Sequence, residues 1–344
     1  MRAPSDSRFP ISDSRLREPT RLIIVRLSAI GDIVHALPLA ENAHRAGVAV
    51  GWVVERAYAS LLEPHPAIAA VFPADTRQWR RKPLSLRSRT EIRRLRADLR
   101  DFRADAVVDA QGLWKSALLA RLAGAPIVSL GARDRRERTS SVLVDRAVTL
   151  DPALEHVVDQ NLSLLEPLHI PVAVRAPNAR YLLDVARDEA DRFASSLPRP
   201  FALFHPGASR AEKAWGEEKY AALARRLSES SGISPVISWG PGDEIRADRL
   251  GKLLPDAARL PHLDFAGLAH VVAQAALFIG GDTGPVHLAD AIGTPTLALF
   301  SKSSSRNMPA RNRPYSGASM SYDQASEIEA VVTMAMSAAR CPPP

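Results

Sequence analysis

The sequence predicts an α/β protein made of two doubly wound parallel-sheet halves that face each other across a cleft. Its 344 residues are about twice the length of a typical domain of ~150 residues. Short β-branched runs alternate with helical patterns in the first half, and the alternation restarts at Phe201. A Pro-containing connector at 171–180 separates the two series.

The first half follows a polar, aperiodic stretch, residues 1–20, that we expect to be a flexible N-terminal extension. The apolar run Arg21–Leu27 predicts a strand, and helical spacing predicts a helix after it at 33–46. The next expected elements are a strand at 48–54, a helix at 57–62, a basic helix at 86–102, a strand at 106–109, a helix at 113–122 and a strand at 126–130. We expect this domain to span 21–172.

The second half repeats the pattern. The expected elements are a strand at 201–204, a helix at 217–228, a strand at 234–239, a helix at 268–276, a strand at 277–279, a helix at 285–292 and a strand at 296–300. We expect this domain to span 173–330, with a C-terminal tail at 331–344.

The composition is that of a globular protein, with 46% hydrophobic and 24% charged residues, which excludes wholesale disorder. No run approaches ~18 apolar residues and the first 20 residues lack the apolar core of a secretory signal. The single cysteine, Cys341, allows no disulfide within the chain. These features predict a cytoplasmic protein without a membrane span.

Positive charge dominates, with a net charge of +7 and 39 arginines beside six lysines. A GC-rich genome would explain the arginine count but not its clustering. Residues 77–103 hold eleven Arg or Lys, and 86–102 carries apolar residues at helical spacing. Such a helix suits an anionic membrane surface, the alternative being a solvated arginine-rich face. Nucleic acid is not expected as a partner, because Trp79 and Phe102 are the only rings there for bases to stack on.

Ligands of doubly wound sheets bind beyond the carboxyl ends of the strands. After the first strand comes the loop Ser28-Ala-Ile-Gly-Asp32, with His35 one turn on. This loop is neither a P-loop nor a GxGxxG motif, which argues against dinucleotide binding there. Asp32 is either a helix N-cap, the commoner role for Asp in such a place, or a functional carboxylate.

The stretch Gly280–His287 (GGDTGPVH) is the most informative strand end. Consecutive glycines let the backbone approach a ligand closely, Thr283 or Asp282 can cap the following helix, and Pro285 suits its start. The open N–H groups and the helix dipole favour a phosphate there. His287 on the same face favours a binding function over a simple cap.

Two other strand ends are weaker candidates. Ser209 and Lys213 follow the strand at 201–204, where they either bind an anion or belong to an ordinary surface turn. Glu244 opens a helix after the strand at 234–239, where it either accepts ribose hydroxyls or favours the helix dipole. The chain has no Asp-x-Asp motif and no cluster with metal-ligand spacing, so no metal is expected.

Two motifs together resemble the family 9 glycosyltransferases, the bacterial ADP-heptose:lipopolysaccharide heptosyltransferases. They are RLSAIGDIVHALP at 26–38 and DTGPVH at 282–287. Three further stretches resemble the members that add the first heptose to the Kdo residues of lipid A: WVVE at 52–55, RQWRRK at 77–82 and DAQGLWKSA at 109–117. The likeness spans roughly residues 21–330.

The resemblance implies a GT-B fold of two Rossmann-like domains, the first binding the acceptor and the second ADP-heptose. It implies inverting, metal-independent transfer of L-glycero-D-manno-heptose to a Kdo residue of Kdo-lipid A in the lipopolysaccharide inner core. Asp32 matches the general base, which takes the proton of the attacking Kdo hydroxyl.

The resemblance also implies the binding residues. The donor-binding positions are Ser209, Lys213, Glu244, Leu263, Asp282, Thr283, Gly284 and His287. The acceptor-binding positions are Ser28, Gly31, Arg80, Arg81, Lys82, Lys115 and Arg138. No cofactor is expected besides the donor substrate, and the protein is expected to be a monomer, peripheral on the cytoplasmic face of the inner membrane.

The chain departs from the family pattern in three places. Ala29 stands where the family often has a second serine, 301–308 replaces an expected glycine-led loop, and 1–20 has no counterpart. Two alternatives stay open. A related family 9 enzyme would add a later heptose, and a nucleotide-sugar epimerase would turn over the donor without an acceptor.

Overall fold

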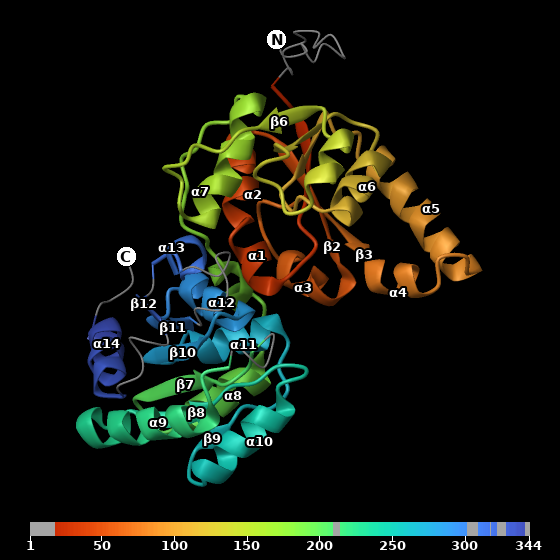
Figure 1. Cartoon of the computed structure of the whole chain (residues 1–344). Helices are drawn as coiled ribbons and strands as arrows, with labels where there is room; N and C mark the ends of the chain where they lie inside the picture. The colour runs from red at the N-terminus through yellow and green to blue at the C-terminus, as the bar shows by residue number, and fades with distance from the viewer. Residues whose placement is uncertain (1–17, 209–213, 301–308, 317, 322–327, 341–344) are drawn as a thin grey trace, which may run out of the picture.

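The structure is a computed structural model that describes residues 18–208, 214–300, 309–316, 318–321 and 328–340. In this part of the chain two six-stranded parallel sheets lie one above the other, one in each half (Figure 1). Helices cover both sheets. The predicted doubly wound α/β class is confirmed.

The strand order of the first sheet is β3-β2-β1-β4-β5-β6, and that of the second is β12-β11-β10-β7-β8-β9. The first sheet consists of β1 (Arg21–Val25), β2 (Ala49–Glu55), β3 (Ala70–Ala74), β4 (Ala106–Asp109), β5 (Ile127–Leu130) and β6 (Arg146–Val148). The second consists of β7 (Phe201–His205), β8 (Ser234–Ile237), β9 (Ala258–Arg259), β10 (Leu277–Gly281), β11 (Thr296–Phe300) and β12 (Ala318–Ser321). The order reverses between β1 and β4 and between β7 and β10, so these strand ends are where a ligand is expected.

Burial explains which strands were predictable. The strands β4, β7, β10 and β11 are buried along their whole length, and they appear in the sequence as continuous apolar runs. The sequence reading missed β3, β6, β9 and β12. Of these, β3 contains Pro73 and lies at the edge of its sheet, where a proline is tolerated.

The helices of the first half differ from expectation at one place, where two helices stand instead of one. The expected helix at 33–46 is two helices, because the chain starts again at Leu37 with Pro38 in the first turn, where its missing N–H is not needed. The α-helices are α1 (Ile30–Val34), α2 (Leu37–Arg45), α3 (Ala59–Leu62), α4 (Thr76–Arg81), α5 (Leu86–Asp101), α6 (Trp114–Leu122) and α7 (Val157–Leu162). The 3₁₀ helices of this half are η1 (Arg56–Tyr58), η2 (Arg138–Leu143) and η3 (Ser163–Leu168), and η4 (Arg180–Asp184) comes before the first α-helix of the second half.

The second half differs from expectation at two helices. The helix expected at 268–276 begins at Phe265, because the Asp264 carboxylate accepts a hydrogen bond from the Gly267 N–H at 2.7 Å and caps it there. Residues 331–340, expected in the tail, belong to α14, whose Val331 and Ala335 are buried in the core of this half. Its helices are α8 (Asp188–Ser196), α9 (Glu217–Ser231), α10 (Glu244–Leu253), α11 (Phe265–Val272), α12 (Gly284–Ile292), α13 (Pro309–Asn312) and α14 (Ile328–Arg340).

The basic helix α5 forms close to the expected bounds, but its apolar side is not available to a membrane. Leu95 and Leu99 are buried in a core cluster with Phe72 of β3. Its charged side and the exposed Leu86 at its start face outward. The expected contact of this helix with an anionic membrane surface stays a prediction. No helix in the described residues is long and apolar enough to cross a membrane.

The two halves share a hydrophobic core, which includes Leu37 from the first half and Ile292 from the second. The connector is held by Asn42 of α2, whose side-chain oxygen accepts hydrogen bonds from the backbone N–H groups of Ala173 and Val174 at 2.7 and 2.9 Å. These contacts hold the end of the first half against the start of the second. The domain limits of 172 and 173 stay a prediction.

Candidate active site

Asp32 lies in the first turn of α1, at the switch point of the first sheet. The guanidinium of Arg26, the residue that follows β1, donates to Asp32 Oδ1 at 2.5 Å, and the Ala29 N–H donates to Oδ2 at 3.3 Å. Arg26 is buried and also donates to the Ala110 carbonyl, whereas 44% of the Asp32 side chain is exposed. The carboxylate is thus held at one end by a fixed cation while remaining open to an incoming molecule. Arg26 was not among the predicted site residues.

A hydrogen-bond network under this loop starts from a buried ion pair. Arg135 donates to Asp109 at 3.0 Å with both side chains fully buried, and the other Asp109 oxygen accepts from the N–H groups of Gln111 and Gly112. Gln111 in turn accepts from the Leu27 N–H at 2.7 Å and donates to the Ser28 carbonyl at 3.2 Å. The loop after β4 therefore sets the position of the loop that carries Asp32.

Two glycines allow α1 of the first half to touch α12 of the second. A Cβ on Gly31 would lie 2.5 Å from Cδ2 of His287, and a Cβ on Gly284 would lie 2.5 Å from Cβ of Ile30. Real side chains do not approach so closely, so glycine is required at both places for this contact. The structure brings together the two motifs that the sequence singled out, 250 residues apart.

Three buried histidines meet at this contact. The ring centre of His35 lies 4.4 Å from that of His287 and 5.4 Å from that of His156. Burial holds the pKa of His35 well below its usual value, and His287 and His156 lower it further. Burial likewise lowers the pKa of His156. Near neutral pH, the His35 ring is therefore uncharged.

The GGDTGPVH motif at 280–287 runs from the end of β10 into the start of α12. Thr283 occupies the N-cap position and Pro285 the first turn, although the Thr283 side chain makes no capping hydrogen bond. Oδ1 of Asp282 lies 3.7 Å from Nε2 of His287. The helix start thus presents backbone N–H groups and a positive dipole end, which suit a phosphate. The Asp282 carboxylate and His287 lie beside them.

Beside it, the ends of β7 and β8 bring together two residues that the sequence reading missed. His205, the last residue of β7, is buried with Nε2 3.5 Å from Oδ2 of Asp243. A Cβ on Gly207 would lie 2.4 Å from that Asp243 oxygen and 2.5 Å from His205 Nε2. A strand-ending histidine followed two residues later by a glycine is a weak signal, since the partner Asp243 becomes visible only after folding.

Of the other predicted donor residues, Glu244 is the first residue of α10, exposed, and accepts a hydrogen bond from the Gly242 N–H at 2.9 Å. Leu263 is half-buried just before α11. Ser209 and Lys213 lie outside the described residues. Their donor-binding roles stay predictions.

On the acceptor side, Glu55 connects two groups of predicted residues. Its carboxylate accepts hydrogen bonds from the N–H and hydroxyl of Thr76, the first residue of α4, and lies 3.7 Å from Nζ of Lys115. Because α4 carries Arg80 and Arg81, Glu55 sets that helix in relation to Lys115 on α6. Glu55 belongs to the WVVE stretch at 52–55 but was not among the predicted site residues.

The remaining acceptor candidates lie around the same surface. Arg80, Arg81 and Lys82 are exposed at the end of α4. Arg138 is exposed between Glu137 and Thr139, both of which accept hydrogen bonds from Trp114 at the start of α6. Ser28 is half-buried, whereas Gly31 is buried against His287.

Two pockets lie to the sides of this contact, and neither is lined by Asp32 or Asp282. One, of about 330 Å³, lies between the halves and is lined by Ser60 and Glu63 on one side and by Arg187 and Phe265 on the other. It adjoins Leu263 in sequence, the position that the resemblance assigns to adenine.

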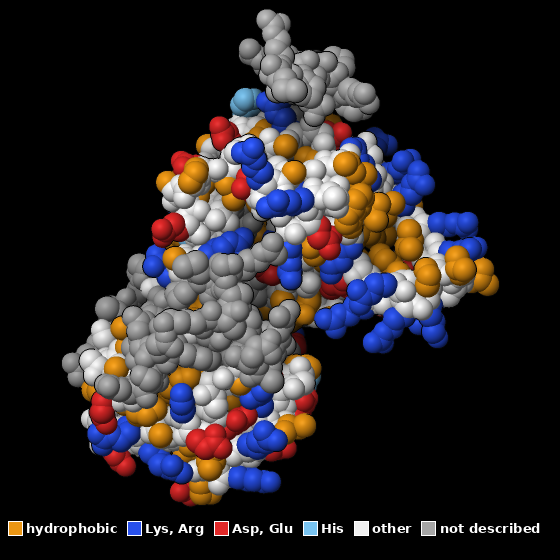
Figure 2. Space-filling model, viewed as in Figure 1, with side chains coloured by type: hydrophobic (Ala, Val, Ile, Leu, Met, Phe, Trp, Pro, Cys, Tyr) orange, Lys and Arg blue, Asp and Glu red, His pale blue; other side chains and the backbone are white. Residues whose placement is uncertain are grey.

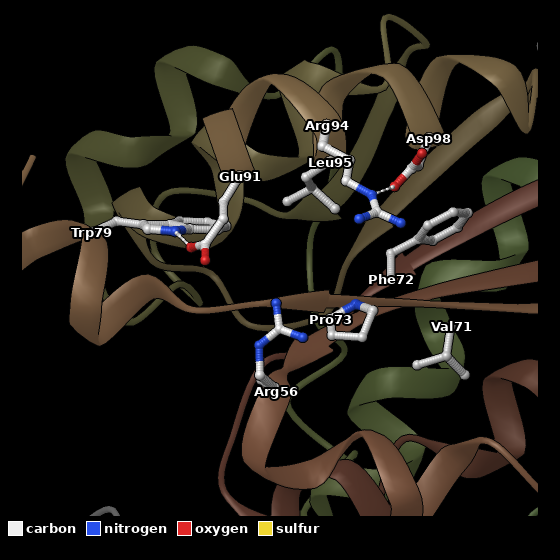
Figure 3. Close-up of a pocket in the computed structure, with 9 residues that line it drawn as sticks. All are labelled: Arg56, Val71, Phe72, Pro73, Trp79, Glu91, Arg94, Leu95 and Asp98. Atoms are coloured by element: carbon white, nitrogen blue, oxygen red, sulfur yellow. Dashed lines mark hydrogen bonds and ion pairs between the residues drawn. The ribbon is translucent and has the colours of Figure 1, made fainter. Parts of the chain in front are cut away.

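The other pocket, of about 350 Å³, lies between β3, α4 and α5 (Figure 3). Arg56 and Arg94 line it, but so do Glu91 and Asp98, so the four charges cancel. Glu91 also accepts hydrogen bonds from Trp79 and Arg87, which lower its pKa. This pocket therefore lacks the positive potential that a phosphate site requires.

Within the described residues, no three His, Cys, Asp or Glu side chains gather where they could hold a metal ion.

Comparisons with known proteins show the family of this chain. The family model described as glycosyltransferase family 9 (heptosyltransferase) matches residues 92–335. The chain is 35% identical to lipopolysaccharide heptosyltransferase 1 of Pseudomonas aeruginosa over 81% of this chain and 78% of that protein. It is 31% identical to lipopolysaccharide heptosyltransferase 1 of Escherichia coli K12 over 81% of this chain and 87% of that protein. The solved structure of the E. coli heptosyltransferase WaaC with ADP superposes with a TM-score of 0.76 at 28% identity, over 92% of this chain and 99% of that one.

Proposed function

Because the chain belongs to glycosyltransferase family 9, we propose that it transfers L-glycero-D-manno-heptose from ADP-heptose to a Kdo residue of lipid A. The chain is a glycosyltransferase, and its relatives are heptosyltransferases of lipopolysaccharide synthesis. One observation supports the finer proposal most: Asp32, held by Arg26 at the switch point of the first sheet, lies on the helix that touches the start of α12.

In the proposed reaction, Asp32 is the general base. Its carboxylate accepts the proton of the Kdo hydroxyl while that oxygen attacks the anomeric carbon of the heptose. The bond from the anomeric carbon to the phosphate oxygen breaks on the opposite face, so the configuration inverts and ADP leaves with the electron pair. Arg26 keeps the Asp32 carboxylate in place, and the exposed side of that carboxylate can meet the acceptor.

The leaving diphosphate requires positive potential from the second half. The N–H groups at the start of α12 supply part of it, because they point out of the helix end unpaired by the helix itself. Lys213, with Ser209, is proposed from the resemblance to contact the phosphates. Asp282 is proposed to bind sugar hydroxyls, since a carboxylate would repel the diphosphate. No metal is proposed to take part.

The acceptor is proposed to bind on the first half. Arg80, Arg81, Lys82, Lys115 and Arg138 are the cations proposed to bind the carboxylate and phosphate groups of Kdo-lipid A. Glu55 supports this arrangement, because it holds α4 and Lys115 together. We propose that the protein works as a monomer at the cytoplasmic face of the inner membrane, where such a lipid acceptor would lie.

The function is tested by incubating the protein with ADP-heptose and Kdo-lipid A, each alone and together, with EDTA present. We expect ADP release and a product heavier by one heptose only when both substrates are present, with the inverted anomeric configuration by NMR. Turnover of ADP-heptose without an acceptor would indicate an epimerase. Transfer only to a lipid A that already carries heptose would indicate a later-acting relative.

A further inference from the structure

The turn between α4 and α5 exposes two large apolar side chains. Leu86 and Leu84 are 83% and 76% exposed, the highest values among the large hydrophobic residues that the structure describes. They flank Ser85, which caps α5 by accepting a hydrogen bond from the Ser88 N–H at 3.1 Å. One exposed leucine is ordinary on a protein surface. Two in a capped turn form an apolar tip of defined shape, which we call the 84–86 tip.

The 84–86 tip is surrounded by cations. Residues 80–90 carry five of them, all exposed: Arg80, Arg81, Lys82, Arg87 and Arg89. The nearest acid in the sequence is Glu91, which pairs with Arg87 at 2.9 Å. In Figure 2 apolar side chains gather at the end of the projection formed by α4 and α5, with Lys and Arg side chains around them. A surface of this kind is attracted to negative charge and can bury apolar atoms at its centre.

The projection has a firm base. Leu95 and Leu99 anchor α5 in the core of the first half, and the N-terminus of α4 is held by the hydrogen bonds from Thr76 to Glu55. Figure 1 shows the α4–α5 end projecting from the first half, away from the second. The tip therefore reaches outward on a fixed support.

We propose that the 84–86 tip inserts Leu84 and Leu86 into the surface of an anionic lipid bilayer while the five cations bind lipid headgroups. A bilayer fits better than a second copy, because two such tips would bring five positive charges against five. It fits better than a protein partner, because a projecting tip offers far less than the ~800 Å² per partner of a stable interface. The proposal rests on the proposed function only in that a lipid-linked acceptor places the enzyme at a membrane.

The direct test is binding to lipid vesicles without any donor or acceptor, measured by flotation. The wild type is expected to bind vesicles containing phosphatidylglycerol and to bind neutral phosphatidylcholine vesicles weakly. Binding is expected to fall steeply between 0.1 and 0.5 M salt, since each Lys or Arg near an anionic surface contributes about fivefold at low salt. Absence of binding to anionic vesicles would overturn the proposal.

The matched variants are Leu84→Gln/Leu86→Gln and Ile245→Gln. Ile245, on α10 of the second half, is 68% exposed and receives the same kind of change away from the tip. The double variant is expected to bind anionic vesicles about tenfold or more weakly, while Ile245→Gln binds like the wild type. Equal binding by all three proteins would overturn the proposal. A concentration-dependent dimer in solution that is lost in the double variant would also overturn the proposal, because a second copy would then cover the tip.

Insertion itself has a separate readout. Because Cys341 is the only cysteine, Leu84→Cys in a Cys341→Ser background can be labelled at one place with an environment-sensitive fluorophore. A blue shift on adding anionic vesicles supports insertion, and an unchanged spectrum overturns it. Transfer to a deacylated, water-soluble Kdo acceptor is expected to be unchanged in Leu84→Gln/Leu86→Gln, whereas transfer to vesicle-embedded Kdo-lipid A falls about tenfold. Vesicle binding without any heptose transfer would count against the proposed function and leave this inference standing.

Discussion

Gly284 and Ile30 belong to different halves of the molecule, yet a Cβ on Gly284 would lie 2.5 Å from the Cβ of Ile30. This contact joins the start of α12, where we propose the diphosphate binds, to the start of α1, which carries Asp32. The contact gives Gly284 a structural reason to be glycine, which is separate from any need for a ligand to approach the backbone there.

Gly284→Ala is expected to destabilise the protein by about 1–3 kcal/mol, because the Ile30 Cβ is attached to the backbone and cannot move aside as a flexible side-chain end would. Denaturant unfolding followed by circular dichroism measures the change. Gly251→Ala is the matched control, since the nearest atom to its Cβ is 3.8 Å away and alanine favours the helix interior. Equal stability of the two variants would show that α1 and α12 do not touch in solution.

Glu55→Gln is expected to weaken acceptor binding more than it changes turnover. The amide cannot hold the Thr76 N–H and hydroxyl and the Lys115 ammonium together as the carboxylate does. We expect KM for the Kdo acceptor to rise about tenfold, with kcat and the KM for ADP-heptose within about twofold of the wild type. Glu189→Gln, an exposed glutamate on α8, should leave all three constants unchanged. An unchanged acceptor KM in Glu55→Gln would remove Glu55 from the account of the acceptor site.

Glu41 makes the stability of the protein fall as pH rises from about 4.5 to 7. Burial raises its pKa from 4.5 to about 7, so the folded protein keeps a proton that the unfolded chain releases. The stability from this group is complete below pH 4.5 and is lost as pH rises to 7. Glu41→Gln, neutral at every pH, should therefore gain on the order of 1–2 kcal/mol relative to the wild type between pH 5 and pH 8, after allowing for solvent screening. Denaturant midpoints of both proteins at the two pH values test this, and parallel pH curves would contradict it.

The loss of stability at acid pH depends on the buried histidines. The pKa of His35 is depressed, so below about pH 6.5 the unfolded chain takes up a proton that the folded protein does not, and stability falls as pH falls. His35→Gln should make this fall less steep by up to about 1.4 kcal/mol per pH unit. His65, whose pKa burial lowers to about 4, keeps part of the slope. Unfolding free energies at pH 7, 6 and 5 decide the matter, and a variant as acid-sensitive as the wild type would refute the role of His35.

The buried strands and the motifs at their ends were predictable from the sequence because their signals are local, whereas β3, β6, β9 and β12 were missed. Buried parallel strands such as β7 and β10 appear as continuous apolar runs, and the motif after β10 contains the Gly, Pro and Asp of a helix start. The fold class followed from these alone.

The residues that were missed act through partners distant in sequence. Arg26 meets Ala110 across 84 residues, Glu55 meets Thr76 and Lys115, and the His35 ring meets rings at 156 and 287. Nothing in a local pattern indicates such pairings. The same reason hid the partner of the apolar stripe of α5, because such a stripe looks alike whether it faces a lipid surface or, as here, the sheet.

The most direct test of the account compares heptose transfer by the wild type, Asp32→Asn and Asp145→Asn in EDTA. Asp145 is a matched control, a similarly exposed aspartate that pairs with Arg121 at 2.9 Å. We expect the wild type and Asp145→Asn to transfer heptose to Kdo-lipid A at similar rates. Asp32→Asn should bind ADP-heptose normally and turn over about a hundredfold or more slowly, because the proton of the attacking hydroxyl has no acceptor. Near-normal turnover by Asp32→Asn would contradict the central claim that Asp32 is the base.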